Sequence, residues 1–238
     1  MNSSADFGSG LRRLPCRIWY AGRLVGILAL GGALSGGQAA LLHTSIFQRD
    51  FKPDNVFVYP PKLSLDFQRV AVLPLATMSP RSDLADGCEA LAPVLWDQLV
   101  KTHRFEVVSV SAEKLRSRTG QAAWTGTEVL PPDFLAFLRR EYGCDGVLFA
   151  ELTAYNAYAP LAVGWRFKLV DARTGQIIWA ADELFDAARP TIARSACHFE
   201  KRQAADALPA ESGWAVLNSP RRFGGYSAAA LLDTLPDR

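Results

Sequence analysis

Histidine, cysteine and the short motifs of common active sites are scarce or missing in this chain. Among 238 residues there are three histidines and four cysteines. A protein metal site needs three or four converging ligands, and the chain has neither a CxxC pair nor two closely spaced histidines. It also lacks a Gly-x-Ser-x-Gly elbow, a phosphate-binding loop and a Gly-x-Gly-x-x-Gly turn. We therefore predict no metal, no cofactor and no enzymatic activity.

The histidines, and Cys197 beside His198, are better explained by structural roles than by a reactive or metal-binding site. Cys197 and His198 are adjacent and Glu200 is near, but no second cluster of ligands accompanies them. His43 lies in the amino-terminal segment. His103 follows a predicted helix, where a histidine interacts favourably with the helix dipole.

The acidic residues allow one catalytic interpretation and one structural interpretation. Asp182, Glu183 and Asp186 could form a pair of catalytic carboxylates, but we favour solvated charges at the end of a strand. Glu151 and Asp145 are predicted to lie on an exposed sheet face and in a turn.

No excess of positive charge remains outside the amino-terminal region. The chain has 26 basic and 24 acidic residues, which gives a net charge of +2. Removing the four arginines and one aspartate that precede Ala40 leaves 22 basic and 23 acidic residues. Binding to a phosphate backbone needs a concentrated positive face, so we predict no nucleic-acid partner.

Residues 1–40 have the pattern of a signal peptide or membrane anchor. Four arginines, the last of them Arg23, precede an uncharged run over residues 24–42. A basic region followed by an apolar region is typical of a signal peptide, and the small residues up to Ala39 favour cleavage there. The alternative is an uncleaved anchor, because the run approaches the roughly 20 apolar residues that span a bilayer.

The lipid-bearing cysteine of bacterial lipoproteins has no counterpart in this segment. Residues 34–37 read Leu-Ser-Gly-Gly, which is lipoprotein-like but carries glycine in place of cysteine, and Cys16 lies ahead of the apolar run. Lipidation is therefore not supported. We predict that Cys88, Cys144 and Cys197 are buried free thiols, because cysteine is among the most buried residue types and no disulfide framework is evident.

The remaining chain is predicted to comprise an arm, at residues 41–66, and a single α/β domain, at residues 67–238. The arm contains three prolines and four aromatic residues, so part of it is expected to pack on the domain. The first part of the domain alternates strands and helices, which favours a parallel sheet. The strands are expected at 68–75 and 105–110, and the helices at 84–103, after Ser111 to 118, and at 134–142 with Gly143 as the C-cap.

Three further strands are predicted in series. Residues 147–155, 161–171 and 176–185 alternate apolar and polar side chains and are separated by short turns, which is typical of an antiparallel meander. The fold class is therefore α/β, with a mixed sheet of about five strands and helices packed on it. After these strands we expect a helix over 187–207 interrupted at Pro190, a loop over 208–213, and a last helix over 228–235 capped by Ser227.

Four segments in this order resemble a known group of envelope proteins. The segments are Val70–Pro74, Arg104–Val108, Gly143–Asp145 and the hairpin sequence Leu169–Gly175. Together they span about half of the chain. The domain resembles that of the curli-secretion lipoproteins, and it is similar to the lipoprotein activators of penicillin-binding proteins and to the TolB amino-terminal domain.

The resemblance implies an exported bacterial envelope protein without a catalytic centre. It would face the periplasm, or lie at the periplasmic face of the outer membrane. Two departures limit what it implies: the lipid-bearing cysteine is missing, and the connections at 156–160 and 172–175 are too short for the membrane-crossing hairpins of a secretion pore. An accessory or scaffold role is more consistent than a pore.

Two segments outside the four shared ones are candidates for partner binding. Arg221, Arg222, Phe223 and Tyr226 lie in a predicted loop, where arginine charge and aromatic stacking could hold an acidic partner or a glycan. Trp124 lies in a second predicted loop, at 121–130. The alternative is that the three aromatic residues anchor their loops in the core.

The sequence as a whole favours a non-enzymatic envelope protein that acts as a protein-binding or assembly accessory module. Its expected partner is another envelope protein, with membrane contact through the amino-terminal segment, and an oligomer is compatible with this interpretation. The alternatives are an envelope hydrolase or transferase with an unrecognised site, and a subunit anchored in the inner membrane.

Overall fold

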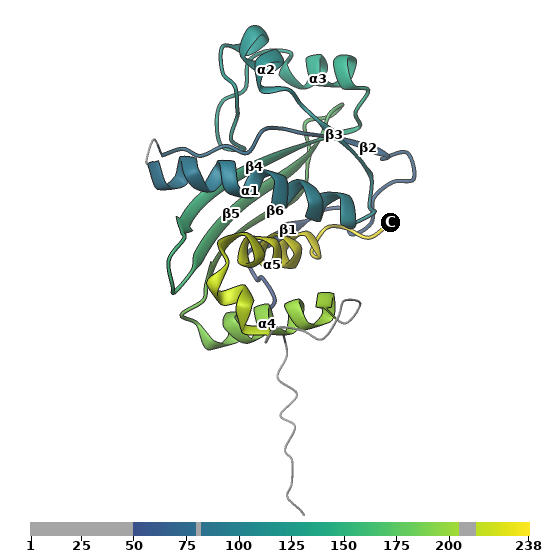
Figure 1. Cartoon of the computed structure of the whole chain (residues 1–238). Coiled ribbons are helices and arrows are strands. Elements are labelled where there is room, and N and C mark those ends of the chain that lie inside the picture. The colour runs from purple at the N-terminus through teal and green to yellow at the C-terminus, as the bar shows by residue number, and fades with distance from the viewer. Residues whose placement is uncertain (1–49, 80–81, 205–212) are drawn as a thin grey trace, which may run out of the picture. The chain divides into compact units, whose positions relative to one another are not determined.

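Six strands form one mixed sheet in the spatial order β1-β6-β5-β4-β2-β3 (Figure 1). The computed structural model describes residues 50–79, 82–204 and 213–238. The strands are β1 (Val56–Val58), β2 (Arg69–Val72), β3 (Glu106–Ser109), β4 (Gly146–Asn156), β5 (Ala162–Asp171) and β6 (Ile177–Asp186). The helices are α1 (Ser82–Lys101), α2 (Ala112–Thr119), α3 (Phe134–Tyr142), α4 (Pro190–Ala204) and α5 (Pro220–Leu232), and a 3-10 helix, η1, covers Gly213–Asn218.

The predicted division of the sheet into a parallel and an antiparallel part is confirmed. Strand β2 pairs in parallel with both β3 and β4. Strands β4, β5 and β6 form an antiparallel meander, with Leu148 opposite Leu169 and Leu169 opposite Trp179. The predicted fold class, an α/β protein with a mixed sheet and packed helices, is therefore correct.

One strand was not foreseen, so the sheet has six strands where about five were expected. Strand β1 lies within the segment predicted to be an arm and pairs antiparallel with β6, with Val56 opposite Ala181. It has only three residues and is followed closely by Pro60 and Pro61. Period-two alternation cannot be recognised in so short a run.

Helices cover both faces of the sheet, so the fold has three layers (Figure 1). On one face α1, α4 and α5 enclose the larger core, to which β2 contributes Val70 and Val72. On the other face α2 and α3 cover a smaller core, to which Ala71 of β2 and the following Leu73 contribute. Successive strand residues point to opposite faces, which explains why Val70, Ala71 and Val72 are all apolar.

Two of the predicted helix ends are confirmed in detail. Ser111 caps α2 by accepting a hydrogen bond from the backbone nitrogen of Lys114. Gly143 ends α3 in the left-handed conformation, with φ of 60°. Pro93 lies inside α1, which nevertheless continues as one helix to Lys101.

The last helix begins eight residues earlier than predicted. Helix α5 starts at Pro220, and its cap is Ser219, whose side chain accepts from the backbone nitrogen of Arg222. Ser227, the predicted cap, is buried within the helix and accepts a hydrogen bond of 2.8 Å from Nε1 of Trp165. Pro220 at the first helical position is compatible with a helix start.

The remaining predictions concern helix α4 and two segments that lie wholly or mostly outside the described residues. Helix α4 starts at Pro190 and is not interrupted by it. The predicted loop at 208–213 lies outside the described residues except for Gly213, which begins η1. The predicted export segment, residues 1–40, lies outside them entirely. Within the described ranges, no helix combines the length and the apolar character needed to cross a bilayer.

Candidate functional site

The carboxyl ends of β2 and β3 lie at a reversal in the chain connections. From β2 the chain crosses to β3 through α1 on one face of the sheet, whereas from β3 it crosses to β4 through α2 and α3 on the other face. In open α/β sheets, ligands bind in the crevice at such a reversal, beyond the carboxyl ends of the strands.

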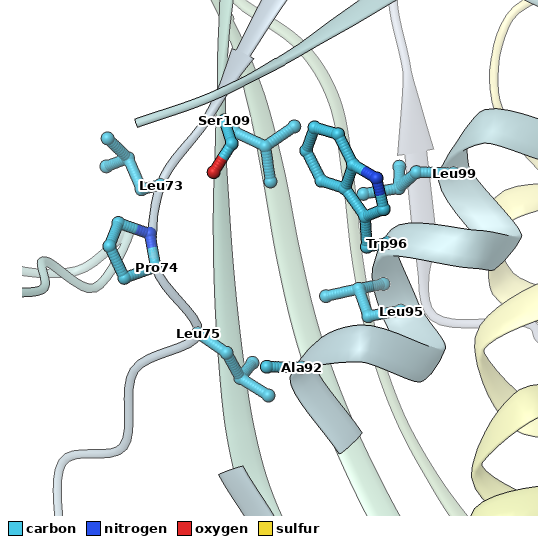
Figure 2. A pocket seen from close by; sticks show the side chains of 9 residues that line it. Leu73, Pro74, Leu75, Ala92, Leu95, Trp96, Leu99 and Ser109 are labelled. Carbon is cyan, nitrogen blue, oxygen red and sulfur yellow. The ribbon is translucent and has the colours of Figure 1, made fainter. Parts of the chain in front are cut away.

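A pocket of about 190 Å³ occupies this place (Figure 2). Figure 2 shows the segment that follows β2 on one side and helix α1 on the other, with Ser109 from the end of β3 between them. The lining residues are Val72, Leu73, Pro74, Leu75, Ala92, Leu95, Trp96, Leu99 and Ser109. We call this cavity the switch-point pocket.

The side chains that line the switch-point pocket are mostly apolar. No titratable side chain lines it, and its side-chain polar groups are the Ser109 hydroxyl and the Trp96 indole nitrogen. Small-molecule sites usually measure roughly 300–1,000 Å³, so the pocket is small for a cofactor. Its volume and lining suit an apolar side chain.

The pocket lies beside an edge of the sheet. Strand β3 is the last strand in the spatial order, so its outer edge pairs with no described strand. Glu106 and Ser109 are exposed at the two ends of this strand. An edge strand presents unpaired backbone groups to which an extended segment of another chain can add.

Two aspartates in the four segments that carry the resemblance stabilise the fold through hydrogen bonds to backbone nitrogens. Asp145 Oδ2 accepts hydrogen bonds of 3.0 Å from the backbone nitrogens of Gln68 and Arg69. Asp171 Oδ1 accepts from the backbone nitrogens of Arg173, at 2.7 Å, and Thr174, at 2.9 Å. These carboxylates fix the start of β2 and the β5–β6 turn, and neither belongs to the switch-point pocket.

The face of the sheet opposite α1 carries a row of charged side chains across β4, β5 and β6. Arg166 Nε donates to Asp182 at 2.8 Å, and its Nη1 lies 3.3 Å from Glu151 Oε2. The prediction that Glu151 is exposed is wrong, because it is only 3% exposed. Burial raises the pKa of Glu151, and the Arg166 guanidinium only partly opposes this effect. The alternation of side chains along β4 predicts the face on which Glu151 lies. It does not predict how far the rest of the chain covers that face.

The other acidic residues and His198 take separate positions. Asp186 Oδ1 accepts a hydrogen bond of 2.8 Å from the backbone nitrogen of Ala188. Glu183 Oε2 is buried without a hydrogen-bond partner among the described residues, so a fully solvated acidic cluster is the wrong description. His198 Nδ1 lies 3.1 Å from Asp50 Oδ1. Within the described ranges, no group of three or more His, Cys, Asp or Glu residues is placed to hold a metal.

The three cysteines of the domain are free, as predicted. Cys144 and Cys197 are buried, whereas Cys88 is half-buried. Burial raises the pKa of each thiol, in the case of Cys88 to about 11. A raised pKa keeps a thiol protonated at neutral pH and therefore unreactive.

The five candidate partner-binding residues do not form one surface. Phe223 and Tyr226 lie in the larger core, and Trp124 lies in the smaller core on the other face of the sheet. Arg221 and Arg222 are exposed at the start of α5, and Arg222 Nη1 lies 3.0 Å from Glu200 Oε1. The segment 221–226 is helical, which corrects the predicted loop.

Sequence reasoning missed the switch-point pocket because its lining comes from three separate segments. Leu95 and Leu99 belong to the apolar stripe of α1, and Val72 to a buried strand, so each position has a sufficient explanation in core packing. Only the order of the elements, with β2 between β3 and β4, could have indicated the site.

Solved structures of bacterial envelope proteins are similar to this chain. The dodecamer of PelC from Paraburkholderia phytofirmans matches with a TM-score of 0.42 and 15% identity, over 77% of this chain and 98% of that one. Lipoprotein GNA1162 from Neisseria meningitidis matches with a TM-score of 0.37 and 18% identity, over 59% and 99%. The LpoB C-terminal domain from Escherichia coli matches with a TM-score of 0.32 and 20% identity, over 50% and 82%.

The chain resembles these envelope proteins. LpoB belongs to one of the groups that the sequence resemblance named, the activators of penicillin-binding proteins. No protein-family model and no curated protein matches the sequence. At these identities the likeness concerns the fold alone.

Proposed function

We propose that this chain is a non-enzymatic bacterial envelope protein that binds another envelope protein through the switch-point pocket. The amino-terminal pattern of arginines and an apolar run supports export, with residues 1–40 as signal peptide or anchor. Residues 41–66 would be the arm and residues 67–238 the binding domain. The periplasm, or the periplasmic face of the outer membrane, is the proposed location.

One observation carries the proposal. The pocket at the reversal of the sheet connections is lined by apolar side chains and by no titratable group. General acid–base chemistry needs a group that exchanges a proton, and covalent catalysis by Ser109 would need an adjacent base. A pocket of this composition is suited to an apolar anchor residue of a protein partner.

The neighbouring edge of β3 suggests how the partner would present its anchor residue. An extended segment can add to an edge strand through backbone hydrogen bonds, while alternate side chains enter pockets beside it. Arg221 and Arg222, at the start of α5, remain proposed as secondary contacts with an acidic surface, whereas Phe223, Tyr226 and Trp124 would act through the core.

Site-specific photocrosslinking in the native cell tests this proposal. Ala92 lines the pocket and is exposed, so a benzoylphenylalanine at this position would lie against a bound partner. Ala85 is exposed on the same helix but does not line the pocket, which makes it the matched control. We expect a discrete protein adduct from position 92 and not from position 85. Equal labelling at both positions would contradict the assignment of the pocket.

Export is tested by the mass of the mature chain in separated cell fractions. We expect a protein that begins near residue 40 in the periplasmic or outer-membrane fraction. An intact chain with Met1 in the inner membrane would favour the alternative of an anchored subunit.

A further inference from the structure

A second and larger cavity lies between the segment that precedes β1 and the helices α4 and α5. Its volume is about 420 Å³, within the roughly 300–1,000 Å³ that small-molecule sites usually occupy. It is separate from the switch-point pocket, with which it shares no lining residue. Phe51 and Phe199 supply aromatic surface to its walls.

The hydroxyl of Tyr226 is the unusual group in this cavity. Tyr226 is 4% exposed and lines the cavity, and its buried hydroxyl donates to no acceptor among the described residues. Burial raises the pKa of Tyr226 to about 12, which exceeds the lowering caused by a hydrogen bond from the Ser195 hydroxyl. A buried donor without an acceptor is costly, so we expect the Tyr226 hydroxyl to donate to a ligand.

Ser195 places a second hydroxyl beside that of Tyr226. Its side chain is 4% exposed and also lines the cavity. Ser195 Oγ already accepts a hydrogen bond of 2.5 Å from the backbone nitrogen of Phe51. Its own hydrogen is directed to the Tyr226 oxygen, so the hydrogen of Tyr226 is the one left to donate to a ligand. A hydroxyl donor next to aromatic walls is complementary to a hydrogen-bond acceptor on an apolar body.

The charged residues at the mouth of the cavity favour an uncharged ligand. Lys52 and Arg202 are exposed there together with Asp50 and Asp233, so the formal charges balance. The Asp50 carboxylate is already engaged by Arg202 at 2.9 Å and by His198 at 3.1 Å. A buried ionic group would meet only hydroxyls and aromatic rings deeper in the cavity, which is unfavourable.

We propose that this cavity binds an uncharged small molecule whose apolar ring packs between Phe51 and Phe199. Its carbonyl-type oxygen accepts from Tyr226, and the Ser195 hydroxyl holds the Tyr226 oxygen in place. The site is independent of the protein partner proposed for the switch-point pocket. Each function can therefore fail without the other.

Three probes that share one ring and differ in one group test the proposal by ligand-observed NMR titration of the full chain. Acetophenone carries a carbonyl acceptor, ethylbenzene has none, and benzoate is charged. We expect the Tyr226→Phe variant to bind acetophenone about fivefold more weakly, the effect of one neutral hydrogen bond, and to leave ethylbenzene unchanged. Benzoate is expected to bind at least tenfold more weakly than acetophenone, because its carboxylate would be desolvated.

Controls separate a ligand-binding hydroxyl from a structural one. Tyr158 is 82% exposed and lies outside the cavity, so Tyr158→Phe should change neither binding nor stability. Tyr226→Phe keeps the ring and should not lower the melting temperature of the free protein. Ser195→Ala should weaken acetophenone binding in the same direction. Unchanged acetophenone affinity in Tyr226→Phe, or a lower melting temperature of that variant without ligand, would overturn the proposal.

Discussion

The pKa of Glu151 depends on two opposing effects, the burial of its carboxylate and its ion pair with Arg166. Its carboxylate is buried on β4 and meets Arg166, whose guanidinium it shares with Asp182. Because the effect of burial is larger than that of Arg166, the pKa of Glu151 is raised in the folded state. The protonated form of this side chain is therefore favoured by folding.

This raised pKa predicts a pH dependence of stability. Between the unfolded pKa of Glu151 and its higher folded value, the native protein binds more protons than the unfolded chain. The contribution of Glu151 is therefore fully present below the unfolded pKa and is lost as the pH rises through the folded pKa. In Glu151→Gln this loss should disappear.

The measurement is the free energy of unfolding of both proteins from about pH 4 to pH 8, by urea denaturation. The difference between them isolates Glu151 from other carboxylates, such as Asp50 and Asp237, whose pKa values are lowered. We expect the variant to become more stable relative to the parent as the pH rises. A constant difference would show that burial does not dominate at this site.

Asp145 carries a second prediction at the residue scale. Its carboxylate accepts from two backbone nitrogens at the start of β2. Asp145→Ala leaves these donors without that acceptor, and we expect a loss of about 1–3 kcal/mol in the free energy of unfolding. Asp66→Ala is the control, because Asp66 is exposed and its side chain forms no hydrogen bond described in the structure, so its loss should be within about 0.5 kcal/mol. Equal effects of the two variants would contradict the assigned role of Asp145.

At the scale of elements, two helices depend on glycine for close packing. A Cβ atom on Gly224 of α5 would lie 2.5 Å from Leu91 Cδ2 of α1, so the two helices can approach only because this atom is missing. In α1, a Cβ atom on Gly87 would lie 2.6 Å from Tyr155 Cγ and 2.8 Å from Leu152 Cδ2 of β4. Glycine at these positions costs helix propensity but permits contact.

Gly87→Ala tests which of these two effects is larger. The gain in helix propensity is about 1 kcal/mol, whereas overpacking a core typically costs about 1–3 kcal/mol. We expect a net destabilisation, measured by chemical denaturation. Gly225→Ala is the matched control in α5, because its nearest contact would be an ordinary 3.5 Å to Val94 Cγ1, and it should be neutral or stabilising. A stabilised Gly87→Ala would show that α1 does not press on β4.

The elements differ in how well the sequence predicts them. Strands β4, β5 and β6 have ten or eleven residues each, so alternation identifies them without ambiguity. The start of α5 was missed because Gly224 and Gly225 are typical of a loop, and only their contact with α1 explains them in a helix. The sequence predicts Ser227 as a cap for the same reason, although its hydroxyl accepts a hydrogen bond from Trp165 in the core.

At the scale of the whole molecule, the order of the strands creates the candidate site. The connection that leaves β2 and the one that leaves β3 run over opposite faces of the sheet, and the switch-point pocket lies at the carboxyl ends of these two strands. The sequence predicted the strands and the parallel pairing but not which residues would meet at their carboxyl ends. That information is tertiary, because the lining combines core positions such as Leu95 and Leu99 with exposed ones such as Ala92, and none of them indicates a site when taken alone.

Filling the switch-point pocket tests its role in the intact protein. Ala92→Phe places a ring over the lining of the pocket, at an exposed position where the fold should tolerate it. Ala85→Phe makes the same change elsewhere on α1. Both variants should unfold at nearly the same denaturant concentration as the parent, whereas only Ala92→Phe should lose the partner identified by crosslinking.

Titration calorimetry would give the dissociation constant of that partner for the parent protein and these two variants. Loss of a buried anchor residue typically costs about 2 kcal/mol or more, which is close to thirtyfold in affinity. We expect at least a tenfold weaker complex for Ala92→Phe and a change within twofold for Ala85→Phe. Equal affinities of all three proteins would contradict binding through the switch-point pocket.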